Sequence, residues 1–316
     1  MGIGSDSFRF MLYAASKGVS YERTLTLGRQ NCFMSQSQID GILGEYDSAY
    51  TKAQALKLKE GLDATEPPFS EPLFRYLGAS AVDSMDYSDY EGATVLHDLN
   101  IPVPDDLKNK YSCVFDGGLL EHVFNYPASI RNCMDMVRVG GWLLLATPGN
   151  NWFGHGFYQF SPELFFSLLS EQNGYTDTRV FLYCQEWCEC ANPRKIKRRT
   201  EMSSINSLNP TSMELYVMSK KTGDTPDRLT VTQSDYEIAW EERDSSHHWN
   251  KASQLQETSS LLRIYLSLPM FIRPLAKKIH RVVRRDPNYD YAKFTAQRQK
   301  KEFLIPCPDF EHPRKQ

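Results

Sequence analysis

The segment from Tyr111 to Pro148 constrains the fold of this chain more than any other. It begins YSCVFDGGLLEHVFN, a short apolar run that ends in an acidic residue and two glycines. A second apolar run, WLLLATP, follows Gly140 and Gly141 and stops at Pro148. Two such runs with a helix-length connection are typical of neighbouring parallel strands joined by a crossover helix. Because nucleotide-like ligands bind at the carboxyl ends of such strands, the segment predicts both a fold and a site.

The same alternation of strands and helices extends over about two thirds of the chain. A helix is expected at 7–17, and one or two more at 35–61. Apolar and β-branched runs predict strands at 24–30, 81–88, 93–100, 112–116, 142–147, 178–184 and 213–221. Strands that alternate with helices in this way form a mostly parallel sheet covered on both faces. We therefore predict an α/β domain over residues 5–221, followed by a mostly helical, basic extension over 222–316.

The extension differs from the domain in charge. The whole 316-residue chain has a net charge of −3, but from Lys251 onward it carries 14 Lys or Arg and only 6 Asp or Glu. Within it, residues 259–285 are basic and amphipathic, interrupted by Pro269 and Pro274. Such a segment can lie on an anionic membrane face, pack back on the domain or form a dimer contact. Nucleic acid is not expected as a partner, because the body is acidic and no RNA-binding module is visible.

The cysteines and the first residues bear on the compartment. Seven cysteines, an odd number, and a start without a basic and apolar leader predict a cytoplasmic protein with free thiols, peripheral to the inner membrane face if 259–285 binds lipid. The sequence contains no apolar run of 18 residues, so no membrane span is expected. Cys184, Cys188 and Cys190 are close enough to suggest zinc, but no fourth Cys or His is near, so no metal is expected. The oligomeric state is not indicated by the sequence.

Acidic residues end three successive predicted strands. Asp86 ends the second, Asp98 the third and Asp116 the fourth. A single strand-end aspartate is usually a turn former, but three in succession favour a ligand, since such a carboxylate can accept both hydroxyls of a ribose. Gly28 ends the first strand, and the GxGxxG pattern of a pyrophosphate-binding site is absent there. The pattern is thus more typical of a nucleoside cofactor without pyrophosphate.

These segments resemble class I S-adenosylmethionine-dependent methyltransferases, and the resemblance covers roughly residues 5–221. The chain is most similar to the subgroup in which the fourth strand leads into Leu-Glu-His, and to a bacterial branch with some members associated with surface-glycan synthesis. The motifs that carry the resemblance are TLTLGRQ, SMDYSDYEGATVLHDLN, YSCVFDGGLLEHVFN, VRVGGWLLLATP and GHGFYQFSPELFF. The family implies a Rossmann-like seven-stranded sheet with an antiparallel last strand, and S-adenosyl-L-methionine as cofactor. Residues 35–68 would then be a helical insertion or a lid.

The resemblance also implies the roles of individual residues. Gly28 resembles the first glycine of the cofactor loop, although Arg29-Gln30-Asn31 replaces the glycine-rich continuation. The other cofactor-binding positions are Asp86 for the ribose, Asp98 and Leu99 for the adenine edge, and Asp116 and Gly117 beneath the methionine part. Glu121 and His122 would border the pocket.

Two histidines are candidates for acting on the methyl acceptor. His155 lies between glycines in the segment after the fifth strand, where a substrate would enter, and His122 follows Glu121. A general base assists methyl transfer when the acceptor is a hydroxyl. His155 could instead be a capping histidine that hydrogen-bonds its loop, and His122 a structural residue that ties its helix to the neighbouring loop. Tyr158 and Gln159 could bind substrate or close the loop, and Glu121 is the third substrate-binding candidate.

The sequence thus predicts a methyltransferase that acts on a small molecule or a glycan intermediate. The alternative is a non-catalytic relative that uses the fold for binding or assembly, suggested by the altered turn after Gly28. Methylation of a nucleobase amine is disfavoured because the Asn/Asp-Pro-Pro-Tyr signature is missing. A nicotinamide-dependent oxidoreductase is disfavoured by the missing glycine pattern.

Overall fold

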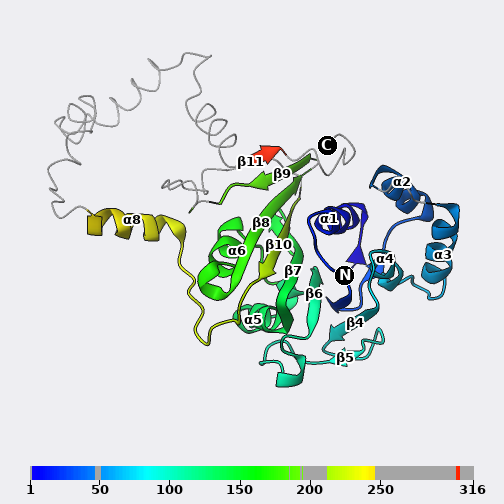
Figure 1. The fold of residues 1–316 in the computed structure, drawn as a ribbon, viewed down its shortest axis with the longest axis horizontal. Coiled ribbons are helices and arrows are strands. Elements are labelled where there is room, and N and C mark those ends of the chain that lie inside the picture. The colour runs from blue at the N-terminus through cyan, green and yellow to red at the C-terminus, as the bar shows by residue number, and fades with distance from the viewer. Residues whose placement is uncertain are drawn as a thin grey trace, which may run out of the picture.

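The computed structural model describes residues 2–46, 51–184, 186–192, 194, 212–245 and 304–306. Its centre is a nine-stranded sheet with the order β11-β9-β8-β10-β7-β6-β2-β4-β5 (Figure 1). The strands are β2 (Arg23–Leu27), β4 (Ala81–Asp86), β5 (Val95–Leu96), β6 (Tyr111–Gly117), β7 (Val137–Asn150), β8 (Tyr175–Cys184), β9 (Glu186–Cys190), β10 (Met213–Lys221) and β11 (Leu304–Pro306). Two further short strands, β1 (Gly2–Ile3) and β3 (Asn31–Cys32), pair in parallel beside it.

The sheet confirms the predicted α/β class and corrects the predicted number of strands. β5, β4, β2, β6 and β7 run parallel, while β10 lies antiparallel between β7 and β8, as expected for the last of the predicted strands. All seven expected strands are present, but the expectation of only seven is wrong, because β9 and β11 extend the edge beyond β8. β9 (EWCEC) and β11 (LIP) are short and lack a continuous apolar run like that of β6, so neither was recognisable from its residues.

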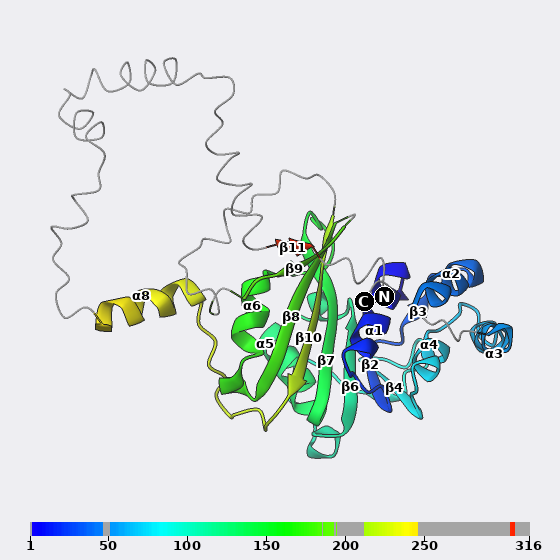
Figure 2. The ribbon, with the colours of Figure 1, turned by 45° about the horizontal axis from the view of Figure 1, so that its top comes forward.

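Helices cover both faces of the sheet (Figures 1 and 2). One face packs against α5 (Tyr126–Met136) and α6 (Pro162–Leu168), and the other against α1 (Ser5–Ser16) and α4 (Glu71–Tyr76). α2 (Gln36–Tyr46) and α3 (Lys52–Leu62) extend the second layer, so 35–61 forms two helices. A role as a lid stays a prediction.

The strands at the centre divide their side chains between these two layers. Val114 of β6 belongs to the hydrophobic cluster under α5 and α6, whereas Cys113 and Phe115 belong to the cluster under α1. Successive residues of a strand point to opposite faces, so a strand buried on both sides must be apolar throughout. This explains why β6 and β7 were visible in the sequence as continuous apolar runs.

The join between β6 and β7 depends on Gly141. A β-carbon at this position would lie 2.8 Å from the carbonyl oxygen of Ser112, so only glycine allows the two strands to approach here. The pairing register shifts at the same place, between Tyr111 and Cys113. Gly141, the second glycine of the pair that precedes the second apolar run, is therefore required by strand packing.

A buried lysine from β10 caps the C-terminal end of the crossover helix α5. Lys221 is 1% exposed, and its Nζ donates hydrogen bonds to the carbonyl oxygens of Met134 (2.9 Å) and Val137 (2.8 Å) and to Asn109 Oδ1 (2.9 Å). The last carbonyls of a helix lack partners within the helix and carry partial negative charge, which an ammonium group satisfies. The last predicted strand thus fixes the end of the central crossover.

The described part of the extension consists mainly of α8 (Ser234–Ser245) and β11. The basic segment 259–285 lies outside the described residues, so the predicted membrane, domain or dimer contact stays a prediction. Among the described helices, none has the length and apolar character needed to cross a bilayer.

Candidate functional site

The parallel strands end at one edge, and β2 is the point where the order of strands reverses. From β2 the chain passes to β4 and β5 on one side, then returns to β6 and β7 on the other. Ligands of open α/β sheets bind outside the carboxyl ends of the strands at such a switch point. Gly28 follows β2 there with φ +68°, a left-handed conformation that favours glycine, and its N–H donates to the carbonyl oxygen of Met85 (2.7 Å).

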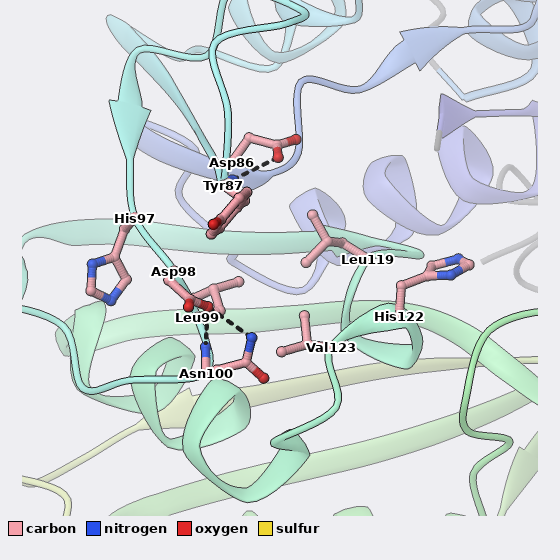
Figure 3. Close-up of a pocket in the computed structure, with 9 residues that line it drawn as sticks. All are labelled: Asp86, Tyr87, His97, Asp98, Leu99, Asn100, Leu119, His122 and Val123. Atoms are coloured by element: carbon pink, nitrogen blue, oxygen red, sulfur yellow. Dashed lines mark hydrogen bonds between the residues drawn. The ribbon is translucent and has the colours of Figure 1, made fainter.

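A pocket of about 430 Å³ lies at this edge beyond β4 and β5 (Figure 3). Asp86, Asp98 and Leu99, three of the predicted cofactor-binding residues, line it together with His122. Its volume falls in the range of small-molecule sites. The structure therefore brings together residues that the sequence placed at the ends of separate strands.

The two pocket aspartates are held differently. Asp86 Oδ1 accepts a hydrogen bond from the backbone N–H of Tyr87 (2.6 Å). Asp98 Oδ1 accepts from both the backbone N–H (2.9 Å) and the side-chain Nδ2 (2.7 Å) of Asn100. These bonds to Asn100, the backbone one first, hold the pKa of Asp98 below its ordinary value. Both carboxylates are therefore oriented acceptors at the pocket.

The turn after Gly28 differs from an open glycine-rich cradle. Gln30 is 1% exposed, and its Nε2 donates to the carbonyl oxygen of Leu27. Its Oε1 lies against Gly117, where an added β-carbon would be only 2.4 Å away. Arg29 points elsewhere, since its Nε pairs with Glu71 Oε1 (2.7 Å). The carboxamide of Gln30 therefore occupies the space between the ends of β2 and β6.

Asp116 is completely buried at the end of β6. Its Oδ1 accepts from the backbone N–H of Leu119 (2.8 Å), whereas Oδ2 has no hydrogen-bond partner within the described residues. Burial, and next the nearby carboxylate of Glu121, raise the pKa of Asp116 well above its ordinary value. Asp116 does not line the pocket that contains Asp86, Asp98 and Leu99. The predicted cofactor-binding residues therefore lie in two places, the pocket and the end of β6.

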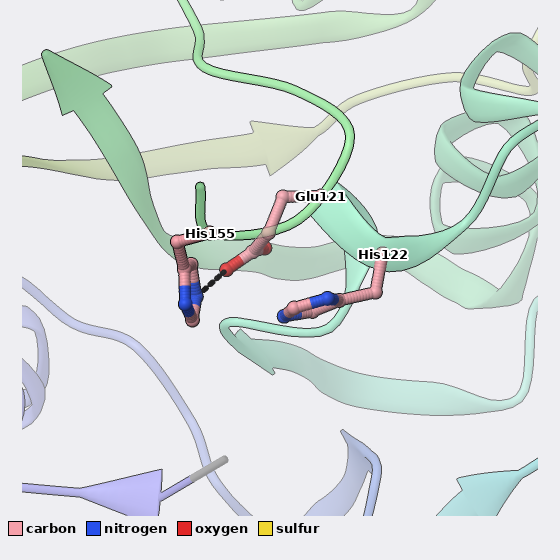
Figure 4. Close-up of side chains that lie close together, drawn as sticks. All are labelled: Glu121, His122 and His155. Carbon is pink, nitrogen blue, oxygen red and sulfur yellow. Dashed lines mark ion pairs between the residues drawn. The ribbon is translucent and has the colours of Figure 1, made fainter. Parts of the chain in front are cut away.

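Glu121, His122 and His155 form a cluster beside the pocket (Figure 4). One ligating atom from each lies within 4.8 Å of the others, and His155 Nε2 is 3.5 Å from Glu121 Oε1. The two imidazole rings meet edge to face at 4.9 Å between centroids. Glu121 is 1% exposed, and both histidines are exposed. The sequence predicted all three residues for this site but not that they would share one cluster.

Burial affects the titration of two members of the cluster. It raises the pKa of Glu121 above its ordinary value, since a carboxylate loses hydration inside the protein. It also lowers the pKa of His122, with the neighbouring His155 as the next cause. Glu121 Oε2 has no hydrogen-bond partner in the described part of the chain.

The loop that carries His155 is fixed on the short 3₁₀ helix Leu120–His122. The N–H of Phe157 donates to the carbonyl oxygen of Glu121 (2.7 Å). Gly156 (φ +65°) lies on the same residue, and a β-carbon there would be 2.9 Å from Glu121 Cγ. The glycine beside His155 therefore allows the loop to approach Glu121 closely.

Tyr158 and Gln159 make contacts within this part of the fold. The hydroxyl of Tyr158 donates to the carbonyl oxygen of Phe124 (2.6 Å), and Gln159 Oε1 accepts from the backbone N–H of Trp152 (2.9 Å). Both contacts match the loop-closing alternative considered from the sequence. Their role in substrate binding stays a prediction.

Two residues of the site were not predicted. Gln30 was noted only as a departure from the glycine-rich turn, and its burial against Gly117 could not be inferred from one sequence. Trp152, whose ring lies 5.2 Å from that of His155, had no signal beyond its position in the loop. Cys184, Cys188 and Cys190, considered for zinc, lie on β8 and β9.

No family model matches the chain, and no curated protein is significantly similar to it in sequence. Among solved structures, the citrinin polyketide synthase CMeT domain matches with a TM-score of 0.37 and 13% identity, covering 70% of this chain and 52% of that one. The Burkholderia thailandensis 1,6-didemethyltoxoflavin-N1-methyltransferase matches with 0.35 and 13%, covering 70% and 79%. The branched-chain polyamine synthase from Thermus thermophilus matches with 0.35 and 12%, covering 72% and 59%. Similarity at this level identifies neither a cofactor nor a substrate for this chain.

Proposed function

We propose that this chain binds S-adenosyl-L-methionine and transfers its methyl group to a small molecule or a glycan intermediate. The observation that carries the proposal is the pocket at the switch point, lined by Asp86 from the end of β4 and Asp98 from the segment after β5. One carboxylate ends β4 and the other follows the neighbouring strand β5, as the resemblance to class I methyltransferases implies.

The pocket fits the nucleoside part of the cofactor. Asp86 supplies carboxylate oxygens for ribose hydroxyls, and Asp98 an acceptor for the exocyclic amine of adenine. Leu99, which is 5% exposed, adds apolar surface against which a flat base can pack. Small-molecule sites combine apolar walls with a few oriented polar groups in this way.

The region of Gln30 and Asp116 fits the amino-acid part of the cofactor, because each side chain has a buried oxygen that lacks a hydrogen-bond donor. Gln30 Oε1 and Asp116 Oδ2 are buried, and no described residue donates a hydrogen bond to either. Buried acceptors without donors cost free energy, which an incoming ammonium group would offset. We assign the α-amino group of the methionine part to this region, with a small shift of the Gln30 side chain on binding.

The cluster of Glu121, His122 and His155 is assigned to the acceptor side. S-adenosylmethionine, when bound, supplies an electrophilic methyl group whose bond to sulfur breaks, leaving the electron pair on sulfur, as the acceptor forms its bond to carbon. The exposed rings of His122 and His155 are available to contact the acceptor, and buried Glu121 fixes the loop that carries His155. Correct placement of the acceptor is the main requirement for methyl transfer.

Calorimetric titration with S-adenosylhomocysteine tests the proposal. We expect saturable binding with one site per chain, because the product retains both the nucleoside and the amino-acid parts. No heat of binding at millimolar ligand would rule out the proposed cofactor.

A non-catalytic binding or assembly role is the second candidate, and the position of Gln30 favours it. The carboxamide fills space that a glycine-rich turn would leave open. An assay for S-adenosylhomocysteine release, run with a panel of hydroxylated small molecules and sugar derivatives, separates the two roles. Turnover with any defined acceptor would eliminate the non-catalytic candidate.

A further inference from the structure

We propose that Glu121, His122 and His155 bind a divalent transition-metal cation. Glu121 offers a carboxylate oxygen and each histidine a ring nitrogen, and the three atoms lie within 4.8 Å of one another. A cation at bonding distance from three ligands holds their atoms a few ångströms apart, so only a small contraction is needed. The proposal departs from the expectation of no metal that was drawn from the sequence.

The state of Glu121 provides an independent reason. Its side chain is 2% exposed and points toward both histidines (Figure 4), yet Oε2 has no donor among the described groups. The contact from His155 Nε2 to Oε1, at 3.5 Å, is too long for a strong hydrogen bond. A buried carboxylate oxygen without a donor is costly, and metal coordination is one of the arrangements that compensates for it.

The backbone holds the three residues of the cluster close together before any ion binds. The 3₁₀ helix presents Glu121 and His122, and the Phe157 N–H to Glu121 carbonyl bond attaches the loop of His155 to it. Gly156 permits this close packing. A preorganised ligand set loses little conformational freedom on binding, which favours affinity.

The ligand types select the class of metal. Two imidazoles and one carboxylate suit Zn²⁺, Fe²⁺, Co²⁺ or Mn²⁺, whereas Mg²⁺ prefers oxygen ligands. Three protein ligands leave coordination positions open, as catalytic metal sites do. Both histidines are exposed and His122 lines the pocket, so the open positions face the region where a ligand would enter.

This placement suggests the chemical class of the acceptor, an inference that rests on the proposed function. A divalent cation beside the methyl group would bind an acceptor hydroxyl and promote release of its proton to solvent. The hydroxyl oxygen then forms the bond to the methyl carbon as the sulfur–methyl bond breaks. The metal site therefore favours a hydroxyl acceptor over an amine.

Electron paramagnetic resonance with Mn²⁺ tests the site directly on the full chain after treatment with chelator. Mn²⁺ is the suitable probe because cysteine sulfur, as in Cys188 and Cys190, selects softer metals. We expect one bound Mn²⁺ per chain, displaced by Zn²⁺. Glu121→Gln, His122→Asn and His155→Asn should each weaken binding at least tenfold, and the control His97→Asn, in the same pocket but outside the cluster, should leave it unchanged.

The exposed positions of His122 and His155 keep the test independent of folding, since neither substitution removes buried structure. Absence of Mn²⁺ and Zn²⁺ binding at millimolar metal, or binding by all three cluster variants as tight as that of the wild type, overturns the proposal. Titration with S-adenosylhomocysteine on the same samples separates the two proposals. Cofactor binding without metal binding contradicts only the metal site, and metal binding without cofactor binding contradicts only the methyltransferase.

Discussion

The side chain of Gln30 lies directly on Gly117, so that a β-carbon at Gly117 would stand 2.4 Å from Gln30 Oε1. This contact joins the turn after β2 to the end of β6 across the switch point of the sheet. It replaces the glycine-rich surface expected from the resemblance with a buried amide. Gln30 can therefore keep this position only while residue 117 has no side chain.

Gly117→Ala is expected to lower the free energy of unfolding by about 1–3 kcal/mol, because the added methyl group overpacks the contact with Gln30. Gln30→Ala removes the opposing side chain, so the double variant should be more stable than the sum of the single effects predicts. Denaturant unfolding of the four proteins measures this coupling. Strict additivity would contradict the contact.

Asp86→Ala is expected to weaken the binding of S-adenosylhomocysteine by roughly 10- to 100-fold, the loss typical of hydrogen bonds to a charged group. Asp89→Ala, in the exposed turn beyond β4, is the matched control and should bind normally. Calorimetry measures both. Equal affinities of the two variants would remove Asp86 from the ribose site.

Glu214→Gln is expected to stabilise the protein at pH 7 but not at pH 4. Burial raises the pKa of Glu214, which accepts a hydrogen bond from Tyr216 and lies near Asp6. A carboxyl group with a raised pKa contributes stability that is fully present below its unfolded value of 4.5 and is lost as the pH rises through the folded value. Glutamine retains an acceptor for Tyr216 and cannot ionise.

Denaturant unfolding of wild type and Glu214→Gln across this pH range provides the measurement. The difference between the two proteins isolates Glu214 from the other titrating groups. A stability difference that does not change between pH 4 and pH 7 would show that the carboxyl group is not destabilised by burial.

Lys221→Met is expected to lower the free energy of unfolding by about 2–4 kcal/mol, since several buried carbonyl oxygens at the end of α5 would lose their donor. The neighbouring Lys220→Met is the control, because Lys220 is only partly buried and lies over the ring of Trp142 (5.9 Å). Its effect should stay within about 0.5 kcal/mol. Similar losses for both variants would contradict the capping role of Lys221.

Local pattern was sufficient to predict the centre of the sheet. β6 and β7 are buried on both faces, so their apolar runs are continuous and distinct. β11 joins the edge from residues 304–306, more than a hundred positions after its partner β9, and three residues carry no periodic signal. Pairing of this kind depends on the tertiary fold.

The site was predictable where it follows strand ends, as with Asp86 and Asp98, because topology alone brings such ends to one edge. The contact of Glu121 with His155 depends on how a loop packs on a 3₁₀ helix. The burial of Gln30 depends on the space above Gly117. Neither contact follows from a fixed spacing in the sequence, because both depend on the tertiary fold.

The antiparallel strand β10 also determines when the protein can assemble. In the described part of the sheet, β10 lies between β8 and the parallel strands, and β9 lies beyond β8. During synthesis, residues 175–190 emerge before Met213–Lys221. β8 and β9 therefore cannot join the sheet until β10 has been synthesised. Until then the edge of β7 stays unpaired, and any chain that stops short of β10 leaves a long apolar edge open to association with other chains.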